Sequence, residues 1–230
     1  MTITRTAVVT GAAQGMGKSI VEALRKSGHT VHGVDRDEAD LSNADAAKAY
    51  FEKIGRVDIL VNCAGGVVGQ THKPLDEITD DAWKQIFDAN LQTTFLSTRA
   101  VIKGMKENGW GRIVNISSGA GRSVSLTGIQ AYATAKAAQI GFTRQMAHEL
   151  GQYGITVNCI APGFVLSNPS TIKQWESYGP EGQEKLKMGI ATRRLGKAED
   201  IANGVSFFVQ EESDWVTGQC LSIDGGHSLF

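Results

Sequence analysis

Short apolar runs, rich in β-branched residues, alternate along the chain with longer stretches in which apolar residues recur at helical spacing. An uninterrupted apolar run is typical of a strand buried on both faces, and helical spacing is typical of an amphipathic helix. Their alternation predicts parallel strands joined by helices. The expected strands are residues 6–10, 30–34, 58–65, 111–118, 155–163 and 219–226.

The expected helices lie between these strands. They cover residues 16–27, 44–54, about 80–107, a segment that includes 131–144, and 198–209. Right-handed crossovers then give an α/β fold, a Rossmann-like, doubly wound parallel sheet flanked by helices. The length suits one domain, residues 1–230. The long stretch 164–191 shows no regular pattern, and we expect it to form a lid over the substrate.

Composition and charge exclude several classes of function. The formal net charge is −1, so no long-range field favours nucleic acid or an anionic membrane surface. No apolar run approaches the roughly 20 residues of a membrane span, and the N-terminus begins as a strand rather than a signal peptide. Three separate cysteines suggest reduced thiols, and the five histidines show no metal-ligand spacing. We therefore expect a cytoplasmic protein without a metal, a membrane or a nucleic-acid partner.

A glycine cluster, TGAAQGMG at residues 10–17, follows the first expected strand and begins the first helix. Such glycines permit a sharp turn, a close approach of backbone to a pyrophosphate, and tight packing of helix on strand. The helix N-terminus then offers N–H groups to phosphates. The cluster predicts a dinucleotide site, although three glycines are also compatible with simple turn chemistry. The expected contacts are Gly11, Gln14, Gly15, Met16 and Gly17.

Asp35 stands at the end of the second expected strand, eighteen positions after Gly17. A carboxylate there can accept hydrogen bonds from both ribose hydroxyls of NAD and would repel the 2′-phosphate of NADP. Arg36 has the opposite tendency, because a guanidinium can pair with that phosphate. We expect NAD, with NADP the weaker candidate. The alternative interpretation of Asp35 is a solvated loop acid.

Six further motifs occur along the chain. They are NCAG at 62–65, DANLQTTF around Asn90, IVNISS at 113–118, YATAK at 132–136, APG at 161–163 and TGQCLSIDGG at 217–226. Together with the glycine cluster, and in this order, they resemble the short-chain dehydrogenase/reductase family of the core, single-domain type over nearly the whole chain. The resemblance implies a nicotinamide-dependent oxidoreductase that acts on CH–OH groups.

The resemblance assigns catalysis to Asn90, Ser118, Tyr132 and Lys136. Tyr132 takes the proton from a substrate alcohol, or returns it, while hydride moves to or from the nicotinamide. Lys136, one helical turn away, holds the nicotinamide ribose and helps a phenolate to form. Ser118 bonds the substrate oxygen, and Asn90 resembles the family's asparagine that holds a water between the lysine and solvent. Taken alone, the tyrosine and lysine are also typical of a surface pair.

The choice of serine depends on spacing. Ser117 and Ser118 are adjacent, and strand alternation directs them to opposite sides. Ser118 lies fourteen residues before Tyr132, one more than the family usually has. We assign the extra residue to the loop 119–131 and choose Ser118.

The resemblance implies more cofactor contacts, besides Tyr132 and Lys136. The expected positions are Asp40 and Leu41 near the adenine, Asn62, Ala64 and Gly65 beside its ribose, and Pro162, Gly163, Val165 and Ser167 at the nicotinamide carboxamide. Each position is also compatible with a strand-end turn or a helix cap.

One segment departs from the family pattern. Only four residues separate Asp35 from Asp40, where family members usually have a helix and a third strand. A crossover requires about a dozen residues. We therefore expect a shortened region between the family's second and fourth strands, and a sheet with a missing or shortened edge strand beside the adenine pocket.

The substrate pocket is expected between the turn after 62–66, the loop 119–130 and the lid 164–191. Its expected contacts are Ser118, Arg122, Tyr132, Asn168 and Trp175. These polar segments favour a small polar alcohol or ketone, although polar loop residues often face water instead. The family is commonly tetrameric, so we expect a homotetramer or a homodimer.

Two other functions stay open. A 3-oxoacyl thioester reductase would use the same catalytic residues but would normally prefer NADPH, which Asp35 disfavours. A non-catalytic regulator that binds a dinucleotide belongs to a different class, because a fold alone does not fix a function. Such a regulator would tolerate loss of the tyrosine or the lysine.

Overall fold

Six parallel strands form the centre of residues 3–229, the part of the chain that the structure, a computed structural model, describes. Their order in the sheet is β2-β1-β3-β4-β5-β6. The strands are β1 (Thr6–Thr10), β2 (Thr30–Val34), β3 (Ile59–Asn62), β4 (Gly111–Ile116), β5 (Ile155–Pro162) and β6 (Cys220–Ile223). The predicted Rossmann-like parallel sheet is confirmed.

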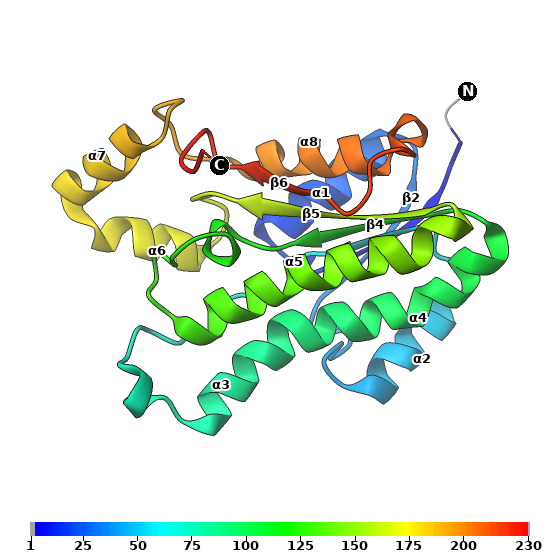
Figure 1. Cartoon of the computed structure of the whole chain (residues 1–230), viewed down its shortest axis with the longest axis horizontal. Coiled ribbons are helices and arrows are strands. Elements are labelled where there is room, and N and C mark those ends of the chain that lie inside the picture. Colours follow the sequence, from blue (N-terminus) through cyan, green and yellow to red (C-terminus); the bar gives the residue numbers. More distant parts are fainter. Residues whose placement is uncertain (1–2, 230) are drawn as a thin grey trace.

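Helices cover both faces of the sheet (Figure 1). One face carries α1 (Gly15–Lys26) and α8 (Ala198–Val209), and the other carries α2 (Ala44–Ile54), α4 (Thr93–Asn108) and α5 (Gln130–Leu150). Beyond the carboxyl ends of the strands lie α6 (Pro169–Ser177) and α7 (Gly179–Gly189). Among the described residues, no helix is long and apolar enough to cross a membrane.

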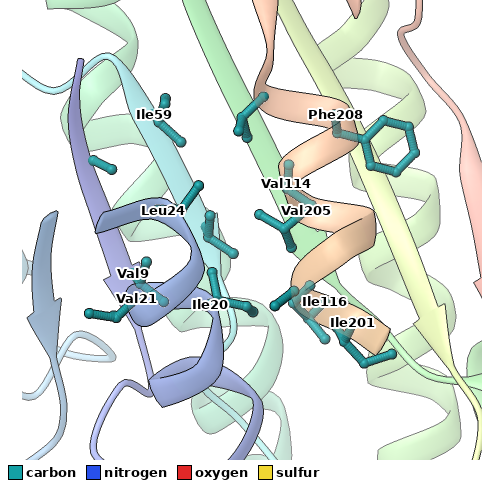
Figure 2. Close-up of a cluster of buried hydrophobic side chains, with 14 of the residues drawn as sticks. Val9, Ile20, Val21, Leu24, Ile59, Val114, Ile116, Ile201, Val205 and Phe208 are labelled. Carbon is teal, nitrogen blue, oxygen red and sulfur yellow. The ribbon is translucent and has the colours of Figure 1, made fainter. Parts of the chain in front are cut away.

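The two helices α1 and α8 pack side by side on the sheet (Figure 2). Ile20 and Leu24 of α1 belong to one apolar cluster with Val205 and Phe208 of α8 and Val114 of β4, all at most 2% exposed. Burying such a side chain contributes roughly 1.5–3 kcal/mol. This packing fixes the N-terminus of α1 beside the end of β1, where the glycine cluster lies.

The chain passes directly from β2 to α2, and α2 leads into β3, which pairs with β1. Within residues 3–229, β2 is therefore an edge strand with no strand beyond it. The predicted shortening between the family's second and fourth strands is confirmed. The remaining connection begins at Asp35 and ends at Asn43, whose side chain accepts hydrogen bonds from the first N–H groups of α2.

The long helix expected over about 80–107 is present in extent, but a π-helical turn that was not predicted interrupts its regular period. The segment consists of α3 (Asp80–Phe87), the π turn Asp88–Gln92, and α4. Asn90 lies in this turn, and its Nδ2 donates to the carbonyl of Ile86 at 2.8 Å. Such turns are often found at functional sites. An extra residue in a helix changes its hydrophobic period only locally, so the pattern did not reveal it.

The irregular structure expected for 164–191 was wrong, because α6 and α7 occupy most of this stretch. A capping box between Asn168 and Thr171 and a proline at the first helical position begin α6. These are local signals for a helix. Neither helix has a fully buried residue, so neither shows the apolar periodicity on which the prediction depended.

Candidate active site

A cleft of about 370 Å³ lies at the carboxyl ends of β1, β2 and β3. The strand order reverses between β1 and β3, and such a switch point is where parallel sheets bind ligands. The turns that follow these three strands line the cleft. It brings together most of the expected cofactor residues: Gly11, Gln14, Gly15, Met16, Gly17, Asp35, Arg36, Asp40, Leu41, Ala64 and Gly65.

The glycine turn fits a phosphate group. Gly11 has a φ of +69°, and a Cβ on Gly17 would collide with the carbonyl group of Gly11, 2.7 Å from its carbon atom. No side chain caps the N-terminus of α1, where Gln14 is the N-cap, and its first turn holds no acidic residue. Its N–H groups are therefore open to an anion.

Two carboxylates line the cleft in fixed orientations. Asp35 accepts hydrogen bonds from the backbone N–H groups of Ala13, at 3.0 Å, and Arg36, at 2.8 Å. It thereby ties the end of β2 to the glycine turn. Asp40 accepts from both the hydroxyl and the N–H of Ser42, and these hydrogen bonds lower the pKa of Asp40.

A second cavity, of about 270 Å³, adjoins the cleft, and Met16 and Asn168 line both. Asn168 also caps α6. The expected residues in the wall of this cavity are Ser118, Tyr132, Pro162, Gly163, Val165, Ser167 and Asn168. Further polar side chains in the wall are those of Ser123, Ser125, Thr127, Thr171, Gln174 and His227, with Val124, Leu126, Phe164 and Leu186 as apolar neighbours.

Tyr132 and Ser118 meet in the wall of this cavity, and Lys136 lies behind them in the interior. Lys136 Nζ lies 5.8 Å from the centre of the Tyr132 ring. Ser118 follows β4 and caps a short 3₁₀ turn through the N–H of Ala120, and its hydroxyl lies near enough to Tyr132 to oppose the rise in the pKa of that phenol. Ser117 points elsewhere, because its buried hydroxyl donates to the carbonyl of Lys136 at 2.7 Å. The geometry thus places Ser118, not Ser117, beside the tyrosine.

Burial dominates the ionisation of this pair. It raises the pKa of Tyr132, although the nearby Ser118 hydroxyl acts in the opposite direction. It also lowers the pKa of Lys136, which is 4% exposed, to about 8. Burial therefore sets the direction of the tyrosine pKa shift in the protein by itself, and the expected help from Lys136 with a bound nicotinamide stays a prediction. At neutral pH Tyr132 is a phenol, the form that can donate a proton.

The stability of the protein should depend on the ionisation of Lys136. Its pKa is about 8 in the folded chain and 10.5 in the reference state, so the unfolded chain binds an extra proton between these values. The free energy of unfolding therefore rises with pH through this window. From about pH 8 to about pH 10, we expect wild type to gain roughly 2 kcal/mol relative to Lys136→Met. Urea unfolding of both proteins measures the gain, and a constant difference would contradict it.

Asn90 is fully buried, and its side chain is tied to the turn after β3. Its Oδ1 accepts from the N–H of Gly66 at 3.0 Å, and its Nδ2 donates to the Gly66 carbonyl at 2.9 Å. The backbone carbonyl of Asn90 faces α5, where Gln139 Nε2 donates to it at 3.2 Å. Asn90 and Lys136 are thus brought together, although neither lines the two cavities.

Besides Asn90 and Lys136, three more expected site residues lie outside both cavities. Arg122 Nη1 donates to Ser222 Oγ, at 2.8 Å, and to the Cys220 carbonyl, both on β6. Trp175 packs against the aromatic rings of Phe164 and Tyr178. Asn62 is buried and donates to Asn115 Oδ1 and Thr98 Oγ1. These contacts hold the sheet and the α6–α7 region together, and the expected ligand contacts of the three residues stay predictions.

Some functional positions were not predicted. Thr10 ends β1, and its Oγ1 accepts from the N–H groups of Cys63 and Ala64, which holds the turn after β3 in place. A polar residue at the end of an apolar strand was the available signal. His227 and Ser228 reach the second cavity from beyond β6. Only the topology reveals them, because the carboxyl end of β6 lies at the same edge of the sheet.

The cysteines and possible metal ligands are the other reactive groups to consider. The three cysteines are free thiols, as expected, and burial raises the pKa of Cys63 to about 12. No group of three or more His, Cys, Asp or Glu side chains that could hold a metal ion occurs among residues 3–229.

A cleft at the switch point of a parallel sheet, beside a cavity lined by a serine and a tyrosine with a buried lysine behind them, is typical of an oxidoreductase of the α/β class. A family model described as Enoyl-(Acyl carrier protein) reductase matches residues 39–228. The (2S)-[(R)-hydroxy(phenyl)methyl]succinyl-CoA dehydrogenase subunit BbsD of Thauera aromatica is 36% identical, over 98% of this chain and 97% of that protein. The 3-oxoacyl-[acyl-carrier-protein] reductase FabG of Vibrio cholerae is 32% identical, over 96% of each.

A solved structure gives the same picture. It is that of a protein from Beutenbergia cavernae, proposed to be an NAD(P)-dependent gluconate 5-dehydrogenase, with NADP bound at low occupancy. The TM-score is 0.88 at 30% identity, over 97% of this chain and 96% of that chain. The chain belongs to the short-chain dehydrogenase/reductase family.

Proposed function

We propose that the protein is an NAD(H)-dependent oxidoreductase that interconverts a secondary alcohol and a ketone, with Tyr132 as general acid and base. One observation carries this proposal: Ser118 and Tyr132 together line a cavity that adjoins the cleft at the glycine turn. A substrate oxygen in that cavity can reach both hydroxyls. A site of this kind can exchange a proton with an alcohol or a ketone.

The protein's own groups account for the proton transfer. A nicotinamide held at this site would supply the hydride chemistry and, in its oxidised form, a positive charge. Tyr132, a phenol at neutral pH because burial raises its pKa, gives its proton to a ketone oxygen in the reductive direction. Ser118 donates a hydrogen bond to the charge that develops on that oxygen. Lys136 lies beneath the Tyr132 ring and keeps a positive charge next to the phenolate that forms.

Asp35 supports the choice of NAD over NADP, because its carboxylate lines the cleft at the end of β2. Arg36 lines the cleft too, and would attract a 2′-phosphate once the acid is neutralised. For Asp35→Asn we expect the preference for NADH over NADPH to fall by roughly tenfold, about 1.4 kcal/mol. Fluorescence titration of both cofactors measures it. Asp37→Asn, the same charge change outside the cleft, should leave the preference unaltered.

The second cavity supports a small polar substrate. Hydroxyl and amide side chains supply most of its polar groups, and no lysine or arginine lines it within residues 3–229. Its one carboxylate, on Asp224, already accepts from the N–H groups of Gly226 and Ser228. An uncharged ketone or alcohol with further hydroxyl groups would therefore find hydrogen-bond partners there.

A 3-oxoacyl thioester reductase is the second candidate. The similarity to FabG favours it, as do two apolar residues of the cavity wall, Val124 and Leu126, which are 88% and 56% exposed. Exposed apolar side chains at the mouth of a cavity can contact an acyl chain that extends out of it.

The test is a substrate panel. The appearance of reduced nicotinamide is followed with NAD or NADP and sugars, sugar acids, hydroxy acids, hydroxyacyl thioesters and cyclic alcohols. NAD-dependent turnover of a small polar alcohol is the expected result. Turnover of thioesters with NADP would favour the second candidate. Tight binding of NADH without turnover of any alcohol, or of any matching ketone in reverse, would favour the non-catalytic regulator instead.

A further inference from the structure

The side-chain amide of Gln139 lies in the protein interior between Lys136 and Asn90. Gln139 is fully buried on α5, three residues after Lys136. Its Oε1 accepts from Lys136 Nζ at 3.0 Å. Its Nε2 donates to the Asn90 carbonyl at 3.2 Å and to Thr94 Oγ1 at 2.7 Å. The amide therefore joins the lysine of α5 to the π turn and the start of α4.

The partners of this amide determine its orientation. An ammonium group only donates and a carbonyl only accepts, so the oxygen of Gln139 must face Lys136 and its nitrogen must face Asn90. In the reverse orientation, the amide nitrogen of Gln139 would face the Lys136 ammonium, donor against donor. Its oxygen would face the Asn90 carbonyl, acceptor against acceptor. Unsatisfied polar groups in the interior are strongly destabilising, so the amide is held in one position.

The Asn90 carbonyl is already occupied by two donors. Thr94 Oγ1 donates to it at 2.8 Å, in addition to Gln139 Nε2. A carbonyl oxygen has two lone pairs, and these two donors use both. The family resemblance implies a water on this asparagine that links the lysine to solvent. In this chain a side-chain amide makes the connection to the lysine instead.

We propose that Gln139 is a positioning residue, which holds the Lys136 ammonium below Tyr132 and replaces the water between Lys136 and Asn90. Lys136 Nζ donates to the Ile116 carbonyl at 2.9 Å and to Gln139, so two of its three N–H donors have fixed acceptors. The effect of Gln139 on the reaction rests on the proposed function. Its effect on the lysine does not.

Within residues 3–229, no anion next to Lys136 stabilises its positive charge in place of Gln139. The titratable groups around the ammonium are Tyr132 on its own helix, Cys63 after β3 and Cys159 on β5. Burial raises the pKa of Cys63 to about 12, and a hydrogen bond with Cys220, together with burial, raises the pKa of Cys159. All three groups are neutral at neutral pH. The neutral acceptors on Ile116 and Gln139 therefore support the charge that burial opposes.

The experiment uses two variants and a matched control. Gln139→Met keeps the length of the side chain and removes the amide, whereas Gln139→Glu keeps an acceptor and adds a charge. Thr143→Val is the control, because it removes a buried hydroxyl one turn further along α5 that does not contact the Lys136 ammonium. The first readout is the titration of the Lys136 ¹³Cε signal in lysine-labelled protein, assigned with Lys136→Met.

We expect the pKa of Lys136 to fall by about one to two pH units in Gln139→Met, because a hydrogen bond to a charged group is lost. It should rise in Gln139→Glu, because a carboxylate favours the ammonium. Thr143→Val should lower thermal stability and leave the lysine titration unchanged. A Lys136 titration that is unaltered in folded Gln139→Met would overturn the proposal. If that variant does not fold, an unaltered titration in Gln139→Glu would overturn it.

The second readout is kinetic. We expect kcat to fall by about tenfold or more in Gln139→Met and its pH profile to move, while KM stays near that of wild type. Thr143→Val should keep the wild-type pH profile. A wild-type protein that turns over no alcohol or ketone would count against the proposed function, and the lysine titration would then decide on Gln139 alone.

Discussion

Replacing Tyr132 with phenylalanine should lower kcat by roughly a thousandfold, within the range of about 10²–10⁴ for general acid and base catalysis. The substitution removes the one hydroxyl that can exchange a proton beside Ser118 in the second cavity. The aromatic ring still packs against the cluster of Ile86, Ala131 and Ala135, so the fold should be preserved. The loss of one hydrogen bond lowers the free energy of unfolding by only about 1 kcal/mol.

This prediction is checked by steady-state kinetics together with NADH titration. The dissociation constant of NADH should change little, because the hydroxyl lies in the wall of the second cavity and not in the dinucleotide cleft. Tyr153→Phe is the control, since Tyr153 is exposed and lies in the turn before β5, at the opposite end of that strand from the site. A Tyr132→Phe protein that keeps more than about a tenth of the wild-type kcat would remove the tyrosine from its proposed role.

Gly17→Ala should have the second large effect, a loss of both stability and cofactor binding. The new Cβ would collide with the carbonyl oxygen of Gly11 and lie 2.7 Å from the carbonyl carbon. Because these atoms belong to the backbone, they cannot rotate away, and α1 must move off the end of β1. That movement disturbs the packing of Ile20 and Leu24 against α8. We expect the free energy of unfolding to fall by roughly 3 kcal/mol.

Gly141→Ala gives the matched comparison. Gly141 lies inside α5, and no atom lies within 4 Å of a Cβ at that position. Alanine there should stabilise the protein by roughly 0.5–1 kcal/mol, because glycine loses more backbone entropy in a helix. Urea unfolding and NADH titration measure both variants. Gly17→Ala with wild-type stability and wild-type NADH affinity would show that the turn does not have the geometry described.

The strands and most helices could be predicted because they are buried. The expected limits of β1, β2, α2 and α8 agree with the structure, since each has an apolar run or an apolar face. The helices α6 and α7 have no buried face. Their signals are the capping box and the proline, which periodicity does not measure. The π turn at Asn90 was missed for a related reason, because a local change of helical period leaves the composition unchanged.

The predictable part of the site is local in sequence. The glycine turn lies within residues 10–17, and Tyr132 and Lys136 are four residues apart. The contacts of Gln139 are different, because they join residues 49 and 45 positions apart across two elements. Polar loop residues were the least reliable guide. Arg122 has the polarity expected of a substrate contact, yet its guanidinium donates hydrogen bonds to β6. The loop sequence does not show whether such a side chain points toward the sheet or into the cavity.

The chain passes from β2 to α2 with no strand between them, and this shows where the fold can lose or gain a strand and its helix. An outermost strand pairs with one neighbour only, so a strand and its helix can be absent there without breaking any other pair in the sheet. Removing an inner strand such as β3 would separate β1 from β4. The edge at β2 is therefore one of the two places, with the edge at β6, where this sheet can gain or lose a whole unit. It is also the natural position at which to graft a segment that changes adenine recognition without altering the chemistry at the other end.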